Sequence, residues 1–226
     1  MLSVVIPTLN AARTLSATVA SLAPGRDLIG EILVVDGGST DGTRAVAEGL
    51  GARVVEAARG RGTQLAAGAG VASGDWLLFL HADTALGLGW AAEAAAFMAA
   101  DPEGSRAAAF RFALDDAAPA ARRLERLVAL RCRWLGLAYG DQGLLIGRRL
   151  YNALGGFRPI PLMEDIDLIR RVGRRRLVLL TTPAVTSAAR YRRGGYLPRS
   201  LRNLGCLALY FLGVPPTRLV RLYGGA

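Results

Sequence analysis

The stretch DWLLFLHADT, from Asp75 to Thr84, decides the fold of this 226-residue chain. Its apolar run, 76–80, has the length of a short buried strand, and such runs are typical of the centre of a parallel sheet. The run stops at His81, Ala82 and Asp83. Open α/β sheets bind ligands beyond the carboxyl ends of their strands, so a carboxylate here is a candidate binding group. A single Asp at a strand end is more often a turn residue, and the other strand ends must be weighed with it.

Three earlier apolar runs alternate with helical patterns. The first strand is predicted to begin at Ser3, and Pro7 either ends it or places it at an edge. Two more strands are predicted at 32–35 and 53–57. A helix is predicted after each strand, the first at 11–22, the second ending at about residue 50 and the third at about residue 72. Asn10 is expected to cap the first helix, and Asp41 or Thr43 the second. The alternation predicts an α/β fold with a mostly parallel, Rossmann-like sheet and helices on both faces.

The second half has a different pattern. An alternating run at 107–114 is typical of an antiparallel edge strand, and an Arg-rich amphipathic helix follows at 118–137. Further helices are expected at 89–100, 163–173 and 198–212, and short strands at 144–146, 177–180 and 185–187. With no linker visible, we expect one domain over 1–226, comprising a nucleotide-binding half (1–84) and an acceptor half (85–226) that ends in amphipathic helices.

Charge is unevenly distributed along the chain. The net charge is +10, every basic residue is Arg, and residues 1–113 carry −3 against +13 for 114–226. The basic half favours an anionic partner such as a diphosphate, a lipid headgroup or nucleic acid. Aromatic residues make up 7% of the chain with no basic–aromatic platform, which counts against nucleic acid. The absence of Lys excludes a P-loop lysine and Schiff-base chemistry, and a single His excludes a His-based zinc site.

Location is indicated by features of the ends and cysteines. Two cysteines, no charged leader and no apolar run of ~20 residues favour a cytoplasmic protein. Arginines beside the apolar run 204–214 suggest a lipid-linked acceptor and peripheral contact with the inner membrane face. The same pattern also suits a helix packed on a core, so both interpretations stay open.

Polar residues at two strand ends and at one helix start are candidates for binding a nucleotide donor. Asp36 heads the Gly-rich loop 37–43 and can accept hydrogen bonds from a nucleobase or ribose, and Pro7 and Thr8 lie beside it. Arg59 and Arg61 flank Gly60 at a helix start, where guanidinium groups and backbone N–H groups bind phosphate. Two solvated arginines are an equally good interpretation of that loop.

Acidic residues supply the candidate metal and catalytic groups. Asp83 is the expected ligand of Mn²⁺ or Mg²⁺, with His81 as a second ligand or a local hydrogen-bonding group. Glu164 and Asp165 open a helix and are candidates for a general base, although acids there also stabilise the helix dipole. The remaining candidates, each balanced by a loop or solvated-surface interpretation, are Asp141 and Gln142 on the acceptor side and Arg190 near the diphosphate.

Together these residues resemble family 2 glycosyltransferases of the GT-A fold. The matching segments are VVIPTLN (4–10), VVDGGSTDGT (34–43), LFLHADT (78–84) and MEDIDL (163–168), and GDQG, TSAARY and LRNLGCLALYFLGVPP resemble a short stand-alone bacterial subgroup. The resemblance implies a nucleotide-sugar donor, inversion at the anomeric carbon, Asp83 as metal ligand and Asp165 as base beside Glu164. His81 departs from the pattern, since the family usually has an acid there.

The sequence therefore predicts a metal-dependent inverting glycosyltransferase that acts on an acceptor hydroxyl. The alternative is a catalytically inactive sugar-nucleotide binding protein with the same pocket. A basic nucleic-acid binder and a nucleotidyltransferase fit less well, the latter because that chemistry usually places a lysine on the phosphates.

Overall fold

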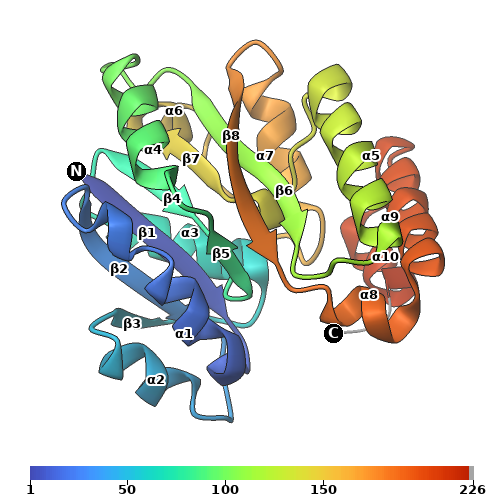
Figure 1. The fold of residues 1–226 in the computed structure, drawn as a ribbon, viewed down its shortest axis with the longest axis horizontal. Helices are drawn as coiled ribbons and strands as arrows, with labels where there is room; N and C mark the ends of the chain where they lie inside the picture. The colour runs from blue at the N-terminus through green and yellow to red at the C-terminus, as the bar shows by residue number, and fades with distance from the viewer. Residues whose placement is uncertain (224–226) are drawn as a thin grey trace.

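A computed structural model describes residues 1–223 and shows one eight-stranded sheet between two layers of helices (Figure 1). The sheet order is β3-β2-β1-β4-β7-β6-β8-β5. The strands are β1 (Leu2–Thr8), β2 (Ile29–Asp36), β3 (Arg53–Glu56), β4 (Trp76–Phe79), β5 (Thr84–Leu86), β6 (Ala107–Leu114), β7 (Leu144–Gly147) and β8 (Leu177–Thr186). The helices of more than one turn are α1 (Ala12–Ala20), α2 (Thr43–Gly49), α3 (Arg61–Val71), α4 (Trp90–Ala99), α5 (Pro119–Leu135), α6 (Arg148–Ala153), α7 (Glu164–Val172), α8 (Ala189–Gly194), α9 (Tyr196–Phe211) and α10 (Pro216–Tyr223).

Strands β1 to β4 form the parallel half of the sheet. β1 pairs in parallel with both β2 and β4, and β2 pairs in parallel with β3. β4 is buried at every position, as its continuous apolar run predicted. Contrary to the prediction, Pro7 neither ends β1 nor places it at an edge of the sheet. β1 lies between β2 and β4 and stays paired with β2 as far as Thr8. Proline is tolerated here because the pairing of β1 with β4 stops at Val5.

The second half of the sheet is mixed and corrects two predictions. β6 is an interior strand between β7 and β8, not an antiparallel edge, and only Arg111 in it is exposed. The predicted strands 177–180 and 185–187 are one strand, β8. Its register against β6 shifts between Ala109 and Arg111, and Arg111 Nε donates to Thr181 O at 3.1 Å across the irregularity. This register shift is a β-bulge beside Pro183. It interrupts the apolar pattern of residues 177–186, but the strand continues through it.

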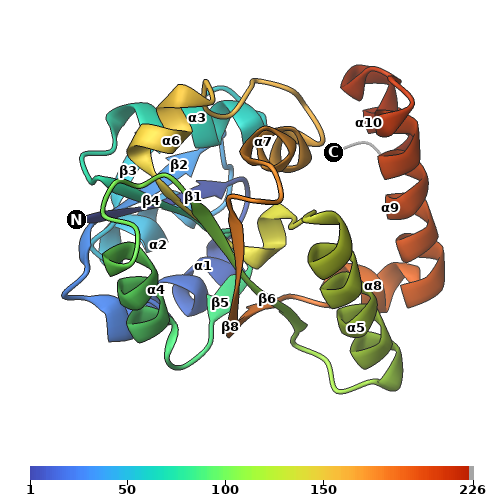
Figure 2. The same cartoon turned by 90° about the horizontal axis from the view of Figure 1, so that it is seen from above.

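The helices cover both faces of the sheet, as predicted (Figure 2). α1, α2 and α4 pack on one face, and α3, α5, α6 and α7 on the other. α3 packs very close to the sheet at Gly68, where a Cβ atom would lie only 2.4 Å from Val5 Cγ1. A third apolar cluster joins α9 and α10 to the start of α7, through Met163, Ile166, Leu207 and Leu219. None of the helices in residues 1–223 is long and apolar enough to cross a membrane.

The start of α1 is capped differently from the prediction. Asn10 does not cap the helix; it has a left-handed φ of 52°, and its Oδ1 accepts a hydrogen bond from Thr40 N at 2.9 Å. Ala11 N donates to Thr43 Oγ1 at 2.8 Å, and Ala12 N donates to Asp41 Oδ2 at 3.2 Å. The 39–43 loop therefore satisfies the first N–H groups of α1 and ties the ends of β1 and β2 together.

Candidate active site

A cavity of about 470 Å³ lies beyond the carboxyl end of β4. It is enclosed by the turn after β4, the end of β8, helix α5 and the loop that follows it, the starts of α3 and α7, and helices α8 to α10. Its charged and ionisable lining comprises Arg61, His81, Asp83, Arg131, Tyr139, Asp141, Asp165, Arg190, Tyr191, Arg199 and Tyr223. Groups from segments that are far apart in the sequence thus face one space, which has the size of a small-ligand site.

Asp83 is held at this cavity by its backbone while its carboxylate stays free. Thr84 N donates to His81 O at 3.1 Å and closes the turn after β4, and Ser187 N donates to Asp83 O at 3.0 Å from the end of β8. The Asp83 side chain makes no hydrogen bond or ion pair within residues 1–223. A cavity-lining carboxylate with both oxygens available is suited to an external cation or hydroxyl group.

Asp165 faces the same cavity from the N-terminus of α7. Met163, the residue before the helix, has a left-handed φ of 66°, which turns the chain sharply into α7. Gly140 N donates to Asp165 Oδ2 at 2.7 Å, and Ile166 N donates to Oδ1 at 2.7 Å. Each oxygen keeps a second acceptor position, so Asp165 is oriented and can still accept a proton.

His81 and Asp165 meet at Gly140. A Cβ on Gly140 would lie 2.6 Å from His81 Nε2 and 3.4 Å from Asp165 Oδ2, so only glycine leaves room for both groups. Burial, together with the positive charges of Arg61 and Arg190, holds the pKa of His81 well below its usual value. The imidazole is therefore neutral at pH 7, which is the form that binds a metal ion.

Asp141 is a third carboxylate on the cavity, and its surroundings disfavour the ionised form. Burial raises the pKa of Asp141 to about 6, Arg131 opposes the shift, and the carboxylates of Asp165 and Asp83 reinforce it. Asp141 Oδ1 is buried without a hydrogen-bond partner among the described residues. Arg131 stacks over the ring of Tyr139 at 3.4 Å from its centroid. An unsatisfied buried oxygen marks a place where a ligand group or cation would be stabilised.

Glu164 faces a different partner from Asp165. It is 1% exposed, and Glu164 Oε1 lies 3.1 Å from Arg61 Nη1, away from the large cavity. Burial raises the pKa of Glu164 and Arg61 opposes the shift. Arg61 itself lines the cavity and its side chain is 35% exposed. Glu164 is therefore paired with Arg61, and it also lines a smaller pocket together with His81 and Asp165, so its predicted place beside the general base stays a prediction.

The predicted nucleoside-binding residues do not line the cavity formed by the described residues. Asp36 is fully buried, and its Oδ2 accepts hydrogen bonds from Ser39 N and Arg44 Nε, each at 2.9 Å. Burial alone would raise the pKa of Asp36, but the hydrogen bonds from Ser39 and Arg44 lower it below its ordinary value. Thr8 Oγ1 lies 3.3 Å from Asp36 Oδ1, and Pro7 precedes it at the end of β1. Asp36 thus organises the loop 37–44 in this conformation.

Other residues correct or extend the predicted site. Gln142 is 2% exposed, and its amide donates to Phe110 O at 2.9 Å, so it braces the fold instead of facing an acceptor. Arg59 is exposed and lies outside the cavity lining. Sequence reasoning missed Arg131 and Tyr139, because one arginine in an Arg-rich helix carries no distinguishing signal. It also missed Gln64, whose Nε2 donates to both Thr8 O and Val35 O at 2.7 Å.

Three groups on the cavity are candidate ligands of a divalent cation. Within residues 1–223 no group of three or more His, Cys, Asp or Glu side chains is arranged to enclose a metal ion. The free Asp83 carboxylate, the neutral His81 imidazole and the orphaned Asp141 oxygen nevertheless suit a partly protein-bound ion. Mg²⁺ is commonly bound by one or two carboxylates with substrate phosphates and waters completing the shell, so the residues fit that kind of site.

Comparison with known proteins identifies the class. The glycosyl transferase family 2 model matches residues 3–159, and the chain belongs to this family. A PGL/p-HBAD biosynthesis glycosyltransferase of Mycobacterium tuberculosis is 41% identical over 95 residues, 38% of this chain and 36% of that protein. Glucosyl-3-phosphoglycerate synthase of the same organism is 36% identical over 92 residues, 36% of this chain and 28% of that protein. The chain thus matches about a third of the length of these relatives.

Solved structures of glucosyl-3-phosphoglycerate synthase from Mycobacterium tuberculosis share the fold. A complex with Mn²⁺, UDP and glucosyl-3-phosphoglycerate has a TM-score of 0.60 and 22% identity, covering 90% of this chain and 78% of that one. A complex with Mg²⁺ and UDP gives a TM-score of 0.60 at 23% identity, with the same coverage. The GT-A-like α/β fold predicted from the sequence is therefore confirmed.

Proposed function

We propose that this protein transfers a sugar, with inversion, from a nucleoside-diphosphate sugar to an acceptor hydroxyl. The observation that carries the proposal is the shared cavity of Asp83, Asp165, Arg61 and Arg190 at the carboxyl end of β4. Family membership supports sugar transfer, and the structural neighbours that hold UDP with Mn²⁺ or Mg²⁺ support a nucleotide donor and a divalent ion.

Asp165 is the proposed general base. Its carboxylate accepts the acceptor's hydroxyl proton, the hydroxyl oxygen forms a bond to the anomeric carbon, and the bond from that carbon to the diphosphate breaks. The diphosphate leaves with the electron pair, and a single displacement from the opposite face inverts the configuration. The hydrogen bond from Gly140 N fixes the Asp165 carboxylate for this role. A positioned base contributes a factor of about 10²–10⁴ to the rate.

Charge on the donor is the second requirement. Asp83, with His81 next to it, would hold the divalent cation, which neutralises the leaving diphosphate. Arg61 and Arg190 line the same cavity and add two fixed positive charges. Glu164 forms an ion pair with Arg61, with Oε1 and Nη1 3.1 Å apart. Asp36, Thr8 and Pro7 are proposed to contact the nucleoside once the loop 37–44 adjusts around it.

The acceptor is proposed to carry an apolar group, as lipid-linked acceptors do. Part of the cavity wall is apolar and is formed by side chains of α5 and α9, namely Leu124, Leu127, Val128, Leu135 and Leu204. A small, fully polar acceptor would leave these side chains against water, whereas an acyl or isoprenoid chain would cover them.

The test is a donor panel of UDP-, GDP- and dTDP-sugars with Mn²⁺, followed by proton NMR of the product released by transfer to water. The expected result is release of nucleoside diphosphate and, from an α-linked donor, a first-formed β-sugar. A first-formed α-sugar would refute inversion. Nucleotide binding without any turnover, with lipid acceptors supplied, would instead favour the inactive sugar-nucleotide binding protein.

A further inference from the structure

Exposed apolar side chains are concentrated on one side of the molecule. Within residues 1–223, ten of the fifteen large apolar side chains that are exposed lie on α5, α9, the residue after α9, and α10. We call this set the helical face, and it comprises Leu127, Leu130, Trp134, Leu135, Leu197, Leu201, Leu204, Phe211, Leu212 and Leu222. α5 and α9 lie side by side beyond the sheet in both views (Figures 1 and 2).

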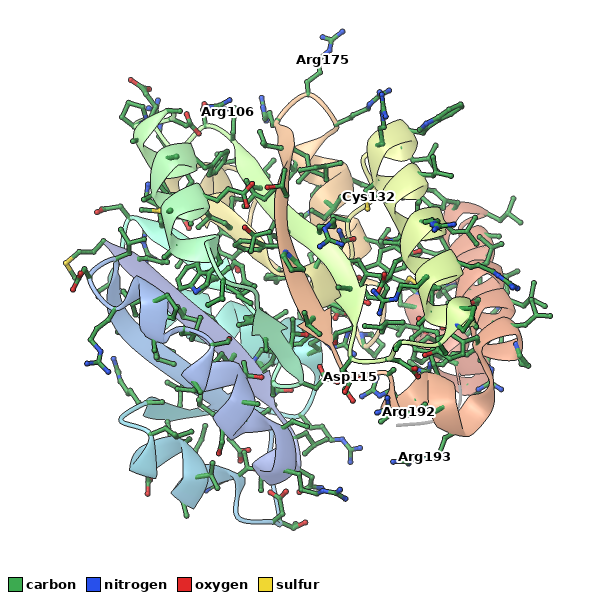
Figure 3. All side chains as sticks on the ribbon, viewed as in Figure 1. Arg106, Asp115, Cys132, Arg175, Arg192 and Arg193 are labelled. Carbon is green, nitrogen blue, oxygen red and sulfur yellow. The ribbon has the colours of Figure 1, made fainter. Side chains whose placement is uncertain are left out.

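The segments that form this face, together with α8 beside them, carry the net positive charge of the chain. Residues 119–135 and 187–226 contain 12 Arg and one acid, Glu125, which gives +11, whereas the net charge of the whole chain is +10. The rest of the chain is therefore at −1. Arg192 is neutralised by Asp115, with Nη1 and Oδ1 3.3 Å apart, whereas Arg193 points away from the molecule (Figure 3). Arg123, Arg126 and Arg202 likewise form no ion pair within the described residues.

The cavity opens onto this face. Leu127, Leu135 and Leu204 line the cavity and are also 63%, 62% and 61% exposed, so they form its rim. The cavity that holds the carboxylates of Asp83 and Asp165 therefore reaches the helical face through apolar side chains of α5 and α9. An amphiphile with its hydroxyl at Asp165 would leave the cavity through this opening.

We propose that the helical face docks on an anionic lipid bilayer and that the acceptor enters the cavity directly from that bilayer. Interfacial helices combine an apolar face with flanking Arg and Lys, and anionic headgroups attract each basic residue near the surface by about 1 kcal/mol. The apolar side chains would enter the headgroup region while the arginines bind lipid phosphates. This proposal rests on the proposed transfer to a lipid-linked acceptor and adds how that acceptor reaches the base.

A second copy of this chain is a poorer occupant for the helical face. A two-fold contact through this face would bring together two surfaces of the same positive sign, since the segments that form and border it hold 12 Arg and one Glu in each copy. An anionic bilayer supplies the missing negative charge.

Trp134 provides the direct test, because it is 70% exposed on the helical face whereas Trp76 and Trp90 are 7% and 0% exposed. The full-length protein is mixed with vesicles of phosphatidylcholine that contain about 30 mol% phosphatidylglycerol and acyl chains brominated near the headgroup. We expect quenching of tryptophan fluorescence that Trp134→Phe removes. Vesicles of phosphatidylcholine alone should bind at least about tenfold more weakly.

Matched variants separate docking from donor binding. Leu201→Glu with Leu212→Glu should weaken vesicle binding by at least about tenfold, and Leu88→Glu, at a 91% exposed leucine of the β5–α4 loop, should leave it unchanged. Both variants should keep the thermal shift caused by UDP and Mn²⁺. Unquenched Trp134 in a protein that still binds UDP would refute docking alone, whereas loss of UDP binding by the unaltered protein would refute the proposed function. A dimer in solution that Leu201→Glu dissociates would assign the face to a second copy instead.

Discussion

Replacing Asp165 by Asn is the most informative change to the proposed mechanism. The amide keeps the size of the carboxylate and can still accept one of the two hydrogen bonds, from Gly140 N or Ile166 N, that hold Asp165 at 2.7 Å. It cannot accept a proton from the attacking hydroxyl. Because a positioned general base contributes about 10²–10⁴-fold, kcat for donor turnover should fall by about that factor.

The donor affinity should change little in this variant, since Asp83, Arg61 and Arg190 remain in the cavity. Asp167→Asn is the matched control on the same helix. Asp167 is paired with Arg158 at 3.1 Å and with Arg171, so its loss should lower stability without a comparable loss of kcat. The assay is nucleoside diphosphate release, with the donor Kd measured separately. Turnover by Asp165→Asn within about threefold of the unaltered enzyme would refute the assignment of the base.

Three further predictions concern the surroundings of the cavity. Gly140→Ala places a methyl group 2.6 Å from His81 Nε2 and should reduce kcat strongly with little change in vesicle binding; unaltered kcat would contradict the packing. The pKa of Asp141 is raised to about 6, so the folded state binds the Asp141 proton more tightly than the unfolded state does. The ionised carboxylate therefore lowers the free energy of unfolding, and this loss increases as pH rises through about 6. Asp141→Asn should therefore raise Tm at pH 8 without metal and have little effect near pH 4, and an equal effect at both pH values would contradict that environment. Asp36→Ala leaves the N–H groups of Gly38 and Ser39 without their acceptor and should cost about 1–3 kcal/mol in urea unfolding, and an unchanged midpoint would refute its role in the loop.

Much of the parallel half of the fold followed from local patterns. The continuous apolar run of β4 and the regular βα spacing of residues 1–84 depend on neighbours that are close in sequence, and they predicted these strands and their parallel direction. β6 and β8 could not be placed in the same way. Their positions depend on pairing across more than sixty residues, and a bulge near Pro183 interrupts the pattern of β8.

The sequence predicted which acidic residues lie at the cavity better than it predicted the groups that they contact. Asp83 and Asp165 follow a buried strand and open a helix, and both line the cavity as the sequence suggested. The sequence could not distinguish Glu164 from its neighbour, because the rotation of α7 against Arg61 decides which acid is buried. Asn10 was misjudged for a related reason, since the loop 39–43 supplies the caps for α1 from another part of the chain.

The central claim is that a nucleoside diphosphate and a divalent cation bind together at Asp83, and thermal shift measures it most directly. With UDP at one hundred times its Kd and Mn²⁺ present, we expect about 2.7 kcal/mol of stabilisation, or roughly 5–10 °C in Tm. Chelation of the metal or Asp83→Ala should remove most of that shift. A full shift in the Asp83→Ala variant, or none with any nucleoside diphosphate in the unaltered protein, would contradict the account.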